Sequence, residues 1–257
     1  TLVARGFTTA AQVDSFLNPS LSRDWSDPGM IPGMTTAVDA VEAAIRANKR
    51  ILIFGDFDLD GVSATAIMVL ALRALGNDPS YLIPNRIDEG YGLTQAALAR
   101  VYELDPELLI TVDCGISARD EVESLLRRGI EVVITDHHEA SGLVPEGIPI
   151  TDPKLVDGSP AGILAGAGVA LKLVALLGAR FGKPQLWLDF VDLATLGTIA
   201  DIMPLIGENR SLVVEGLKQI NLSPRLGIAA SLALCRKAKG DLSASELSYG
   251  LIPRLNA

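Results

Sequence analysis

The sequence has few aromatic residues, few cysteines and few cationic side chains, and each shortage narrows what the protein can be. Phe, Trp and Tyr make up 5% of the 257 residues, so Ala, Leu, Val and Ile must pack the core. Two cysteines, Cys114 and Cys235, cannot form a disulfide framework, which favours a reducing, cytosolic setting. Lys and Arg (22) are outnumbered by Asp and Glu (31), so the formal net charge is −9. Such a chain is a poor general partner for nucleic acid and suits a cation binder if its carboxylates converge.

The sequence also lacks a signal peptide and a membrane span. The first six residues contain no long apolar run and no initiator Met, so we expect a fragment or a processed chain. The most apolar stretch, residues 161–179, carries Lys172 near its middle, and a central lysine costs about 3 kcal/mol in a membrane span. We therefore predict a buried helix there. Hydrophobic residues make up 49% of the chain, which permits a large core and excludes a disordered protein.

Short apolar runs alternate with helical patterns in the first two thirds of the chain. The runs occupy residues 51–54, 81–83, 108–112, 132–135 and 148–151, and the helical patterns cover 62–75, 94–102 and 117–128. Such runs are typical of strands buried on both faces, and the alternation is typical of βαβ units. We predict an α/β fold, a doubly wound, mainly parallel five-stranded sheet with flanking helices, followed by a helical C-terminal segment. Further helices are expected at 8–17, 35–48, 161–177, 186–196, 210–220, 227–239 and 243–251.

Four of the five apolar runs are followed by an aspartate. These residues are Asp56, Asp113, Asp136 and Asp152. Ligands bind beyond the carboxyl ends of the strands in an open parallel sheet. One aspartate could cap a helix, but four on successive strands are hard to explain by capping alone. The sequence therefore predicts carboxylates gathered at one edge of the sheet.

The first strand is followed by three carboxylates at alternate positions, Asp56, Asp58 and Asp60. The spacing matches the first half of an EF-hand loop, but the twelfth position, which needs Glu, is Ile67, and a strand precedes the loop. We therefore predict a strand-to-helix turn with Gly61 opening the helix. Three anions this close repel one another unless a cation neutralises them. The alternative is a helix cap with two solvated neighbours.

Two further segments carry single candidate carboxylates. Asp113 ends the most apolar strand, where it could be a ligand or a helix cap. Its neighbour Cys114 could be a thiolate ligand, but a lone cysteine on a buried strand edge is more often inert. Asp201 follows an apolar helix and needs a partner if it is buried. Sequence alone does not place Asp201 near the other groups.

The only two histidines, His137 and His138, are adjacent and follow the fourth strand directly after Asp136. They could be two surface side chains, but imidazole beside convergent carboxylates suits Mn²⁺, Zn²⁺ or Fe²⁺. Neighbouring residues of an extended chain point to opposite sides, so we expect one histidine to ligate metal and the other to face substrate or solvent.

The assembled site holds too many carboxylates for one metal ion. Two divalent ions about 3.5–4 Å apart would satisfy them, and two-metal sites cleave phosphoesters. The residues by themselves therefore predict metal-dependent phosphoester or phosphoanhydride hydrolysis. The candidate ligands are Asp56, Asp58, Asp60, Asp113, His137 and Asp201.

These motifs resemble those of the DHH phosphoesterase superfamily, named for the run Asp136-His137-His138. Residues 86–93 and 164–170 resemble segments of the RecJ exonucleases, as do residues 5–6 with 16–19 and residues 253–257. The resemblance implies 5′→3′ hydrolysis of single-stranded DNA to mononucleotides in recombination and repair. It implies two divalent cations, with Mn²⁺ preferred and Mg²⁺ as an alternative. It also implies single-stranded DNA as partner, with a helicase and a single-strand-binding protein as further candidates, and a bacterial cytosol or nucleoid location.

The resemblance also assigns roles to the metal ligands. One ion would be held by Asp58 with Asp56 close by, and Asp113 would bridge to the second ion. The second ion would also be held by Asp60, His137 and Asp201. Some family members carry a histidine four residues before Asp58, where this chain has Phe54, so the first ion would lack one protein ligand.

Further roles concern the substrate. His138 would contact the scissile phosphate, Asp136 would orient the two histidines, and Arg254 and Asn256 would lie near a substrate phosphate. Asp136, His137 and His138 are therefore the catalytic candidates.

The resemblance predicts three regions: a helical lead-in (1–49), a DHH catalytic domain (50–205) and a helical connector (206–257) toward a DHH-associated domain that this chain lacks. Without that domain and an oligonucleotide-binding barrel, the chain is expected to bind DNA weakly. Alternatives are a DHH phosphodiesterase of short oligoribonucleotides or cyclic dinucleotides, and a non-catalytic DHH scaffold. A nucleotide-binding Rossmann module is disfavoured because no Gly-x-Gly-x-x-Gly turn is present.

Overall fold

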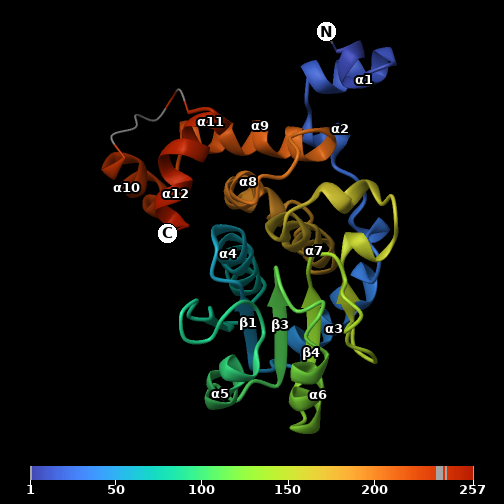
Figure 1. Ribbon diagram of the computed structural model, residues 1–257, viewed down its shortest axis with the longest axis vertical. Coiled ribbons are helices and arrows are strands. Elements are labelled where there is room, and N and C mark those ends of the chain that lie inside the picture. The colour runs from blue at the N-terminus through green and yellow to red at the C-terminus, as the bar shows by residue number, and fades with distance from the viewer. Residues whose placement is uncertain (1, 236–239, 241, 257) are drawn as a thin grey trace.

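The protein is described by a computed structural model that covers residues 2–235, 240 and 242–256 (Figure 1). Residues 236–239 of one expected helix and Ala257 of the C-terminal motif lie outside the described residues. Five parallel strands form one sheet in the order β2-β1-β3-β4-β5. The strands are β1 (Ile51–Gly55), β2 (Ser80–Leu82), β3 (Leu108–Val112), β4 (Glu131–Thr135) and β5 (Ile150–Thr151). Each lies on one of the five apolar runs, so the predicted parallel sheet is confirmed.

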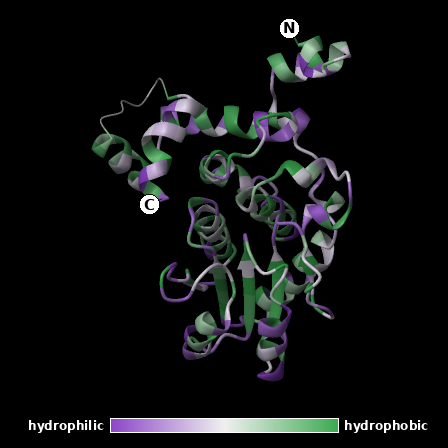
Figure 2. Ribbon diagram, in the orientation of Figure 1, coloured by the Kyte–Doolittle hydropathy of each residue, from purple (hydrophilic) through white to green (hydrophobic). Residues whose placement is uncertain are grey.

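Helices cover both faces of the sheet because successive strand residues point to opposite sides. On one face, Ile53 and Ile110 pack in a core with α3 (Met34–Arg46), α4 (Leu59–Ala74) and α7 (Gly166–Arg180). On the other face, Leu52 and Leu109 pack with α5 (Gln95–Glu103) and α6 (Arg119–Arg127). The predicted doubly wound α/β fold is therefore confirmed. Figure 2 shows hydrophobic residues along the strands and on the helices that face them.

The remaining helices lie at the two ends of the chain. They are α1 (Ala10–Leu17), α2 (Leu21–Asp24), α8 (Val191–Ala200), α9 (Gly207–Leu222), α10 (Leu226–Leu234), α11 (Ala244–Glu246) and α12 (Ile252–Leu255). A π-helical turn, Leu247–Leu251, joins α11 to α12. A third core beneath them includes Leu59, Leu196, Ile220 and Leu247, so the C-terminal helices pack on the first residue of α4 (Figure 1). None of the helices in the described part of the chain has the length and apolarity that a membrane crossing requires.

Several helices begin elsewhere than expected. Helix α4 starts at Leu59 because Asp58 caps it, with its Oδ1 accepting from the Gly61 amide at 2.9 Å. The expected helix at 161–177 is interrupted: a 3₁₀ turn ends at Ile163 and α7 begins at Gly166. The expected helix at 186–196 is likewise a 3₁₀ turn over 186–190 followed by α8. The break before α7 aims the helix N-terminus at the carboxyl edge of the sheet.

Candidate metal centre

The carboxyl ends of three neighbouring strands meet the start of α4, the start of α7 and the end of α8. Asp56 follows β1, Asp113 follows β3, and His137 lies two residues after β4. Asp201 is the C-cap residue directly after α8. The order β1-β3-β4 makes these strand ends adjacent, as expected for a parallel sheet.

His137 lies at the middle of this cluster. Its Nε2 is 3.0 Å from Asp113 Oδ1 and 3.7 Å from both Asp60 Oδ2 and Asp201 Oδ2. The side chains of His137, Asp60 and Asp113 are at most 4% exposed, whereas that of Asp201 is 30% exposed. The cluster therefore opens to solvent beside Asp201.

Helix α7 holds the Asp60 carboxylate. Asp60 Oδ2 accepts from the Gly166 amide at 2.7 Å, and Oδ1 accepts from the Ala167 amide at 3.0 Å. The first amides of a helix have no partner within it, and the helix dipole favours an anion there. Sequence reasoning missed this contact because the two segments are more than 100 residues apart.

Glycines allow the carboxylates to approach each other. A Cβ on Gly166 would lie 2.4 Å from Asp113 Oδ1, and one on Gly197 would lie 2.3 Å from Asp60 Oδ1. Either methyl group would displace a carboxylate. Asp113 itself has a φ of 60°, in the left-handed region that aspartate tolerates better than most residues. The close packing of these carboxylates therefore depends on glycine at positions 166 and 197.

The carboxylates raise one another's pKa values. Burial and then the charge of Asp113 raise the pKa of Asp60 well above its usual value. Burial and then the charge of Asp58 raise that of Asp113 in the same way. Burial raises the pKa values of Asp56 and Asp201 as well. Such groups are costly to hold ionised without a neighbouring cation.

Several buried atoms in the cluster have no hydrogen-bond partner among the described residues: Asp113 Oδ1, His137 Nδ1 and His137 Nε2. The 3.0 Å contact between His137 and Asp113 lacks hydrogen-bond geometry. Buried polar atoms without partners are rare in native proteins, and one common reason is an ion that binds them. Oxygen and imidazole donors suit Mn²⁺ or Mg²⁺, so these residues fit a divalent cation.

Ligand atoms lie within 4.8 Å of one another in two groups, Asp60–His137–Asp201 and Asp113–His137–His138. Asp58 and Asp56 belong to neither group, but their charges raise the pKa of Asp113. The carboxylates of Asp56 and Asp60 are buried, so the alternative of one cap with two solvated neighbours is wrong. His137 is 3% exposed, which also excludes two surface histidines.

Asp136 fixes the orientation of His138. Its Oδ1 accepts from His138 Nδ1 at 2.7 Å and from the His137 amide at 2.8 Å, and its Oδ2 accepts from the Ile116 amide at 2.9 Å. Burial alone would raise the pKa of Asp136, but these hydrogen bonds lower it below the usual value. The hydrogen bond with Asp136 in turn raises the pKa of His138. This pair therefore favours an aspartate anion beside a histidinium.

The two histidines do not point to opposite sides as expected. Their ring centroids are 4.4 Å apart. The strand has ended at Thr135, and Asp136 binds both following amides, so the alternation of an extended chain no longer applies. Still, His137 is buried while the His138 side chain is 41% exposed at the rim.

Tyr91 and Gly92 also reach the site, although sequence reasoning gave neither a role there. The Tyr91 hydroxyl lies 3.0 Å from His138 Nε2, and the Gly92 amide donates to Asp56 Oδ1 at 3.3 Å. Burial, followed by the charges of Asp113 and Asp136, raises the pKa of the Tyr91 phenol. Tyr91 is therefore a neutral donor or acceptor beside His138.

Other candidates lie farther out. Asp152 caps the turn 153–155 through the Lys154 amide and joins no ligand group. Burial raises the pKa of the Cys114 thiol well above its usual value, which disfavours a thiolate. Asn256 Oδ1 accepts from the Leu59 amide at 2.8 Å, between the candidate ligands Asp58 and Asp60 in the chain. Arg254 donates to the Gly250 carbonyl of its own helical segment.

The β1 position that carries histidine in some family members provides no ligand here. Phe54 is fully buried in the core between the sheet and α5.

Comparisons with known proteins agree with this geometry. The single-stranded-DNA-specific exonuclease RecJ of Dickeya dadantii is 40% identical over 245 residues, which are 90% of this chain and 42% of that protein. RecJ of Bacillus subtilis is 39% identical over 258 residues, or 100% of this chain and 32% of that protein. The chain thus spans less than half the length of these relatives.

Solved structures are similar as well. A manganese-bound exonuclease RecJ superposes with a TM-score of 0.79 at 38% identity, over 88% of this chain and 57% of that one. RecJ from Thermus thermophilus in complex with Mg²⁺ gives a TM-score of 0.62 at 33% identity, over 88% of this chain and 29% of that one. The family model described as "DHH family, N-terminal domain" matches residues 50–198. The resemblance drawn from the motifs is confirmed, and the chain belongs to the DHH family.

Proposed function

We propose that the chain is the catalytic core of a two-metal phosphodiesterase that degrades single-stranded DNA from the 5′ end to mononucleotides. One observation carries the proposal: the buried His137 imidazole and Asp113 Oδ1 lack hydrogen-bond partners inside a cluster of carboxylates. The similar proteins are named single-stranded-DNA-specific exonucleases, and their solved structures hold Mn²⁺ or Mg²⁺.

The candidate ligands form two sets that share Asp113. In this proposal Asp60, His137 and Asp201 would hold one cation, Asp58 would hold the other with Asp56 close by, and Asp113 would be a ligand of both. When bound, two such cations would supply Lewis-acid chemistry, which activates a water nucleophile and stabilises negative charge on a phosphate. The α7 amides hold the Asp60 carboxylate in place and oppose the rise in its pKa. Mn²⁺ is the preferred ion because an imidazole is among the ligands.

His138 is proposed to contact the scissile phosphate. Asp136 occupies Nδ1, so Nε2 is the nitrogen that faces Tyr91 and the opening of the site. The raised pKa of His138 favours a proton on both ring nitrogens, and an Nε2–H donor can bind a phosphate oxygen. Asp136 acts through His138 and is a positioning residue.

The C-terminal segment is proposed to border the substrate path. Asn256 accepts a hydrogen bond from the Leu59 amide, which places residues 252–256 beside the turn that carries Asp58 and Asp60. A rotation of Arg254 away from Gly250 would free its guanidinium for a phosphate.

We also propose a lead-in (1–49), a catalytic domain (50–205) and a connector (206–257), since the family model begins at residue 50. Action in the bacterial cytosol or nucleoid, with a helicase and a single-strand-binding protein, is proposed because the relatives are bacterial DNA exonucleases.

Digestion of end-labelled strands tests the function. Single-stranded oligonucleotides labelled at the 5′ or the 3′ end are incubated with the chain and Mn²⁺, Mg²⁺ or EDTA. We expect labelled mononucleotide to appear first from the 5′ end with either metal and none with EDTA. Asp113→Ala should lower the rate by at least about 100-fold because it removes the bridging ligand.

The control variant is Asp78→Ala, which removes an exposed carboxylate paired with Arg73 at the far end of α4. Its rate should equal that of the wild type. First release of the 3′ label would overturn the proposed polarity. An Asp113→Ala variant as active as Asp78→Ala would overturn the metal-dependent mechanism.

A further inference from the structure

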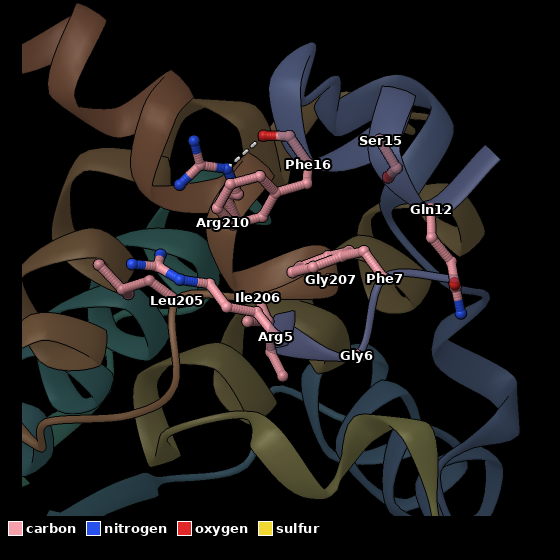
Figure 3. Close-up of a pocket in the computed structure, with 10 residues that line it drawn as sticks. All are labelled: Arg5, Gly6, Phe7, Gln12, Ser15, Phe16, Leu205, Ile206, Gly207 and Arg210. Atoms are coloured by element: carbon pink, nitrogen blue, oxygen red, sulfur yellow. Dashed lines mark hydrogen bonds between the residues drawn. The ribbon is translucent and has the colours of Figure 1, made fainter. Parts of the chain in front are cut away.

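A hollow of about 620 Å³ lies between the N-terminal segment and the start of α9 (Figure 3). It shares no lining residue with the metal centre. Its walls include Arg5, Phe7, Phe16, Ile206 and Arg210. The volume falls within the range of about 300–1,000 Å³ that is usual for ligand sites.

Two cationic side chains face this hollow without a carboxylate. Among the ion pairs of the described residues, none involves Arg5 or Arg210. Arg210 is fixed by its Nε, which donates to the Phe16 carbonyl at 2.6 Å, and its guanidinium lies 4.0 Å from the Phe16 ring centroid. Figure 3 shows both guanidinium groups on the same side of the hollow. The site can therefore accept an anion.

Nearby acidic groups do not neutralise these arginines. Glu208 is buried and binds Lys172 at 2.6 Å. Asp24 binds Arg23 at 2.8 Å and accepts from the Ser20 amide at 2.9 Å. In a chain with a net charge of −9, the hollow is thus a local cationic site.

An aromatic pair lines the same hollow. The rings of Phe7 and Phe16 lie 4.7 Å apart at 52°, and both side chains are half-buried. Arginine beside an aromatic ring that is partly accessible is a combination that binds single-stranded nucleic acid, with phosphate on the cation and base on the ring.

The hollow is close to the metal centre along the chain. Gly207, in its wall, follows the metal-ligand candidate Asp201 by six residues, and an extended segment of that length spans at most about 20 Å. A strand with its 5′ end at the cations could reach the hollow within about six nucleotides at about 3.4 Å each.

We propose that this hollow binds a nucleotide of the single strand that is being degraded, downstream of the scissile phosphate. Arg5 and Arg210 bind a phosphate, and the Phe7 ring stacks on a base. The inference rests on the proposed exonuclease function and adds a second contact for long strands. A peptide with an acidic group would also find charge complementarity here, but the link to Asp201 favours the DNA strand.

Steady-state kinetics with short and long substrates test the inference. Oligothymidylates of 3 and 12 nucleotides are degraded with Mn²⁺ by the wild type, Arg5→Glu and Phe7→Leu. Only the 12-mer can span both sites. Arg5→Glu should raise its KM about tenfold because a phosphate contact is lost, and Phe7→Leu about fivefold because stacking is lost. The kcat values and the kinetics on the trimer should not change.

The matched control is Arg127→Glu, which makes the same charge change on exposed α6. It should leave both KM values unchanged, and the melting temperature of each variant shows whether it folds. Equal effects of Arg5→Glu and Arg127→Glu, or an unchanged KM for the 12-mer with both hollow variants, would overturn the inference while leaving the exonuclease function intact. A wild-type chain that degrades neither oligomer would overturn the function and this inference together.

Discussion

At the residue scale, the candidate metal centre depends on glycines, because a side chain at these positions would meet a carboxylate. A Cβ on Gly166 would lie 2.4 Å from Asp113 Oδ1 and 2.6 Å from Asp113 Cβ, so Gly166→Ala must move Asp113. Groups that support metal ligands typically contribute 10–100-fold to affinity. We expect Gly166→Ala to weaken Mn²⁺ binding by about that factor, as measured by isothermal titration calorimetry.

The control for this substitution is Gly162→Ala. Nothing lies within 4 Å of a Cβ at Gly162, four residues earlier in the same segment. Its Mn²⁺ affinity should match that of the wild type. Equal affinities for Gly166→Ala and Gly162→Ala would show that Asp113 is not held against α7 in the way described.

Asp152 gives a pH-dependent prediction. Burial raises its pKa from 3.8 to about 6. The folded state therefore binds a proton on the Asp152 carboxyl more tightly than the unfolded state does. The stability that this protonated carboxyl contributes is complete below about pH 4 and is lost as the pH rises through 6. Asp152→Asn keeps an acceptor for the Lys154 amide but carries no charge.

We therefore expect Asp152→Asn to be more stable than the wild type by about 3 kcal/mol at pH 8 and by much less at pH 4. Urea unfolding in EDTA at the two pH values measures the difference. A gain of the same size at both pH values would rule out the ionised carboxylate as its cause.

The sequence indicates only some of these residues. Asp56 and Asp113 could be assigned to one edge because parallel strands that alternate with helices must end together. The contributions of Asp201 and Gly166 could not, because they depend on how α7 and α8 pack against α4. Tyr91 was part of a recognised motif, but its contact with His138 depends on the course of a loop.

At the scale of elements, a buried ion pair ties the N-terminal segment to α7 and α9. Lys172 Nζ is fully buried, binds Glu208 Oε2 at 2.6 Å and the Ser26 carbonyl at 2.6 Å, and lies 3.6 Å from the Trp25 ring centroid. Burial lowers the pKa of Lys172, and Glu208 opposes that shift. The lysine that argues against a membrane span is thus the residue that joins three segments.

Removing one partner of this pair should be costly. Lys172→Met leaves the Glu208 carboxylate buried without a cation, which typically costs about 3–5 kcal/mol. The double variant Lys172→Met/Glu208→Met should recover most of that loss because no buried charge remains. Equilibrium denaturation of both variants measures the free energies of unfolding. A double variant no more stable than Lys172→Met would contradict this account.

The helix boundaries show where sequence periodicity stops being sufficient. Apolar residues continue from Ala161 to Leu177, so periodicity predicts one helix. The structure starts α7 only at Gly166, because its free amides bind Asp60 from another element. Local hydropathy contains no information about such a long-range partner.

At the scale of the whole molecule, the turn that carries Asp58 and Asp60 is coupled to distant parts of the chain. Leu59, at the start of α4, packs in the core beneath the C-terminal helices, and its amide donates to Asn256. Asp60, the next residue, is held by α7. The turn therefore touches both the sheet domain and the C-terminal helices, so a cation that binds there should stabilise the folded chain as a unit.

Metal binding should therefore raise global stability. The ligands meet only in the folded state, so Mn²⁺ should stabilise it by about 2.7 kcal/mol at 100 times its dissociation constant. Asp113→Asn removes a carboxylate whose pKa is raised by burial and by Asp58, so it should raise the metal-free melting temperature. It should also abolish most of the increase in melting temperature that Mn²⁺ produces.

Thermal unfolding with EDTA and with increasing Mn²⁺ checks both effects. The control, Asp78→Asn at an exposed position, should behave like the wild type. If Asp113→Asn kept the full Mn²⁺ gain, or lost stability in EDTA, Asp113 could not be the strained ligand at the centre of the site.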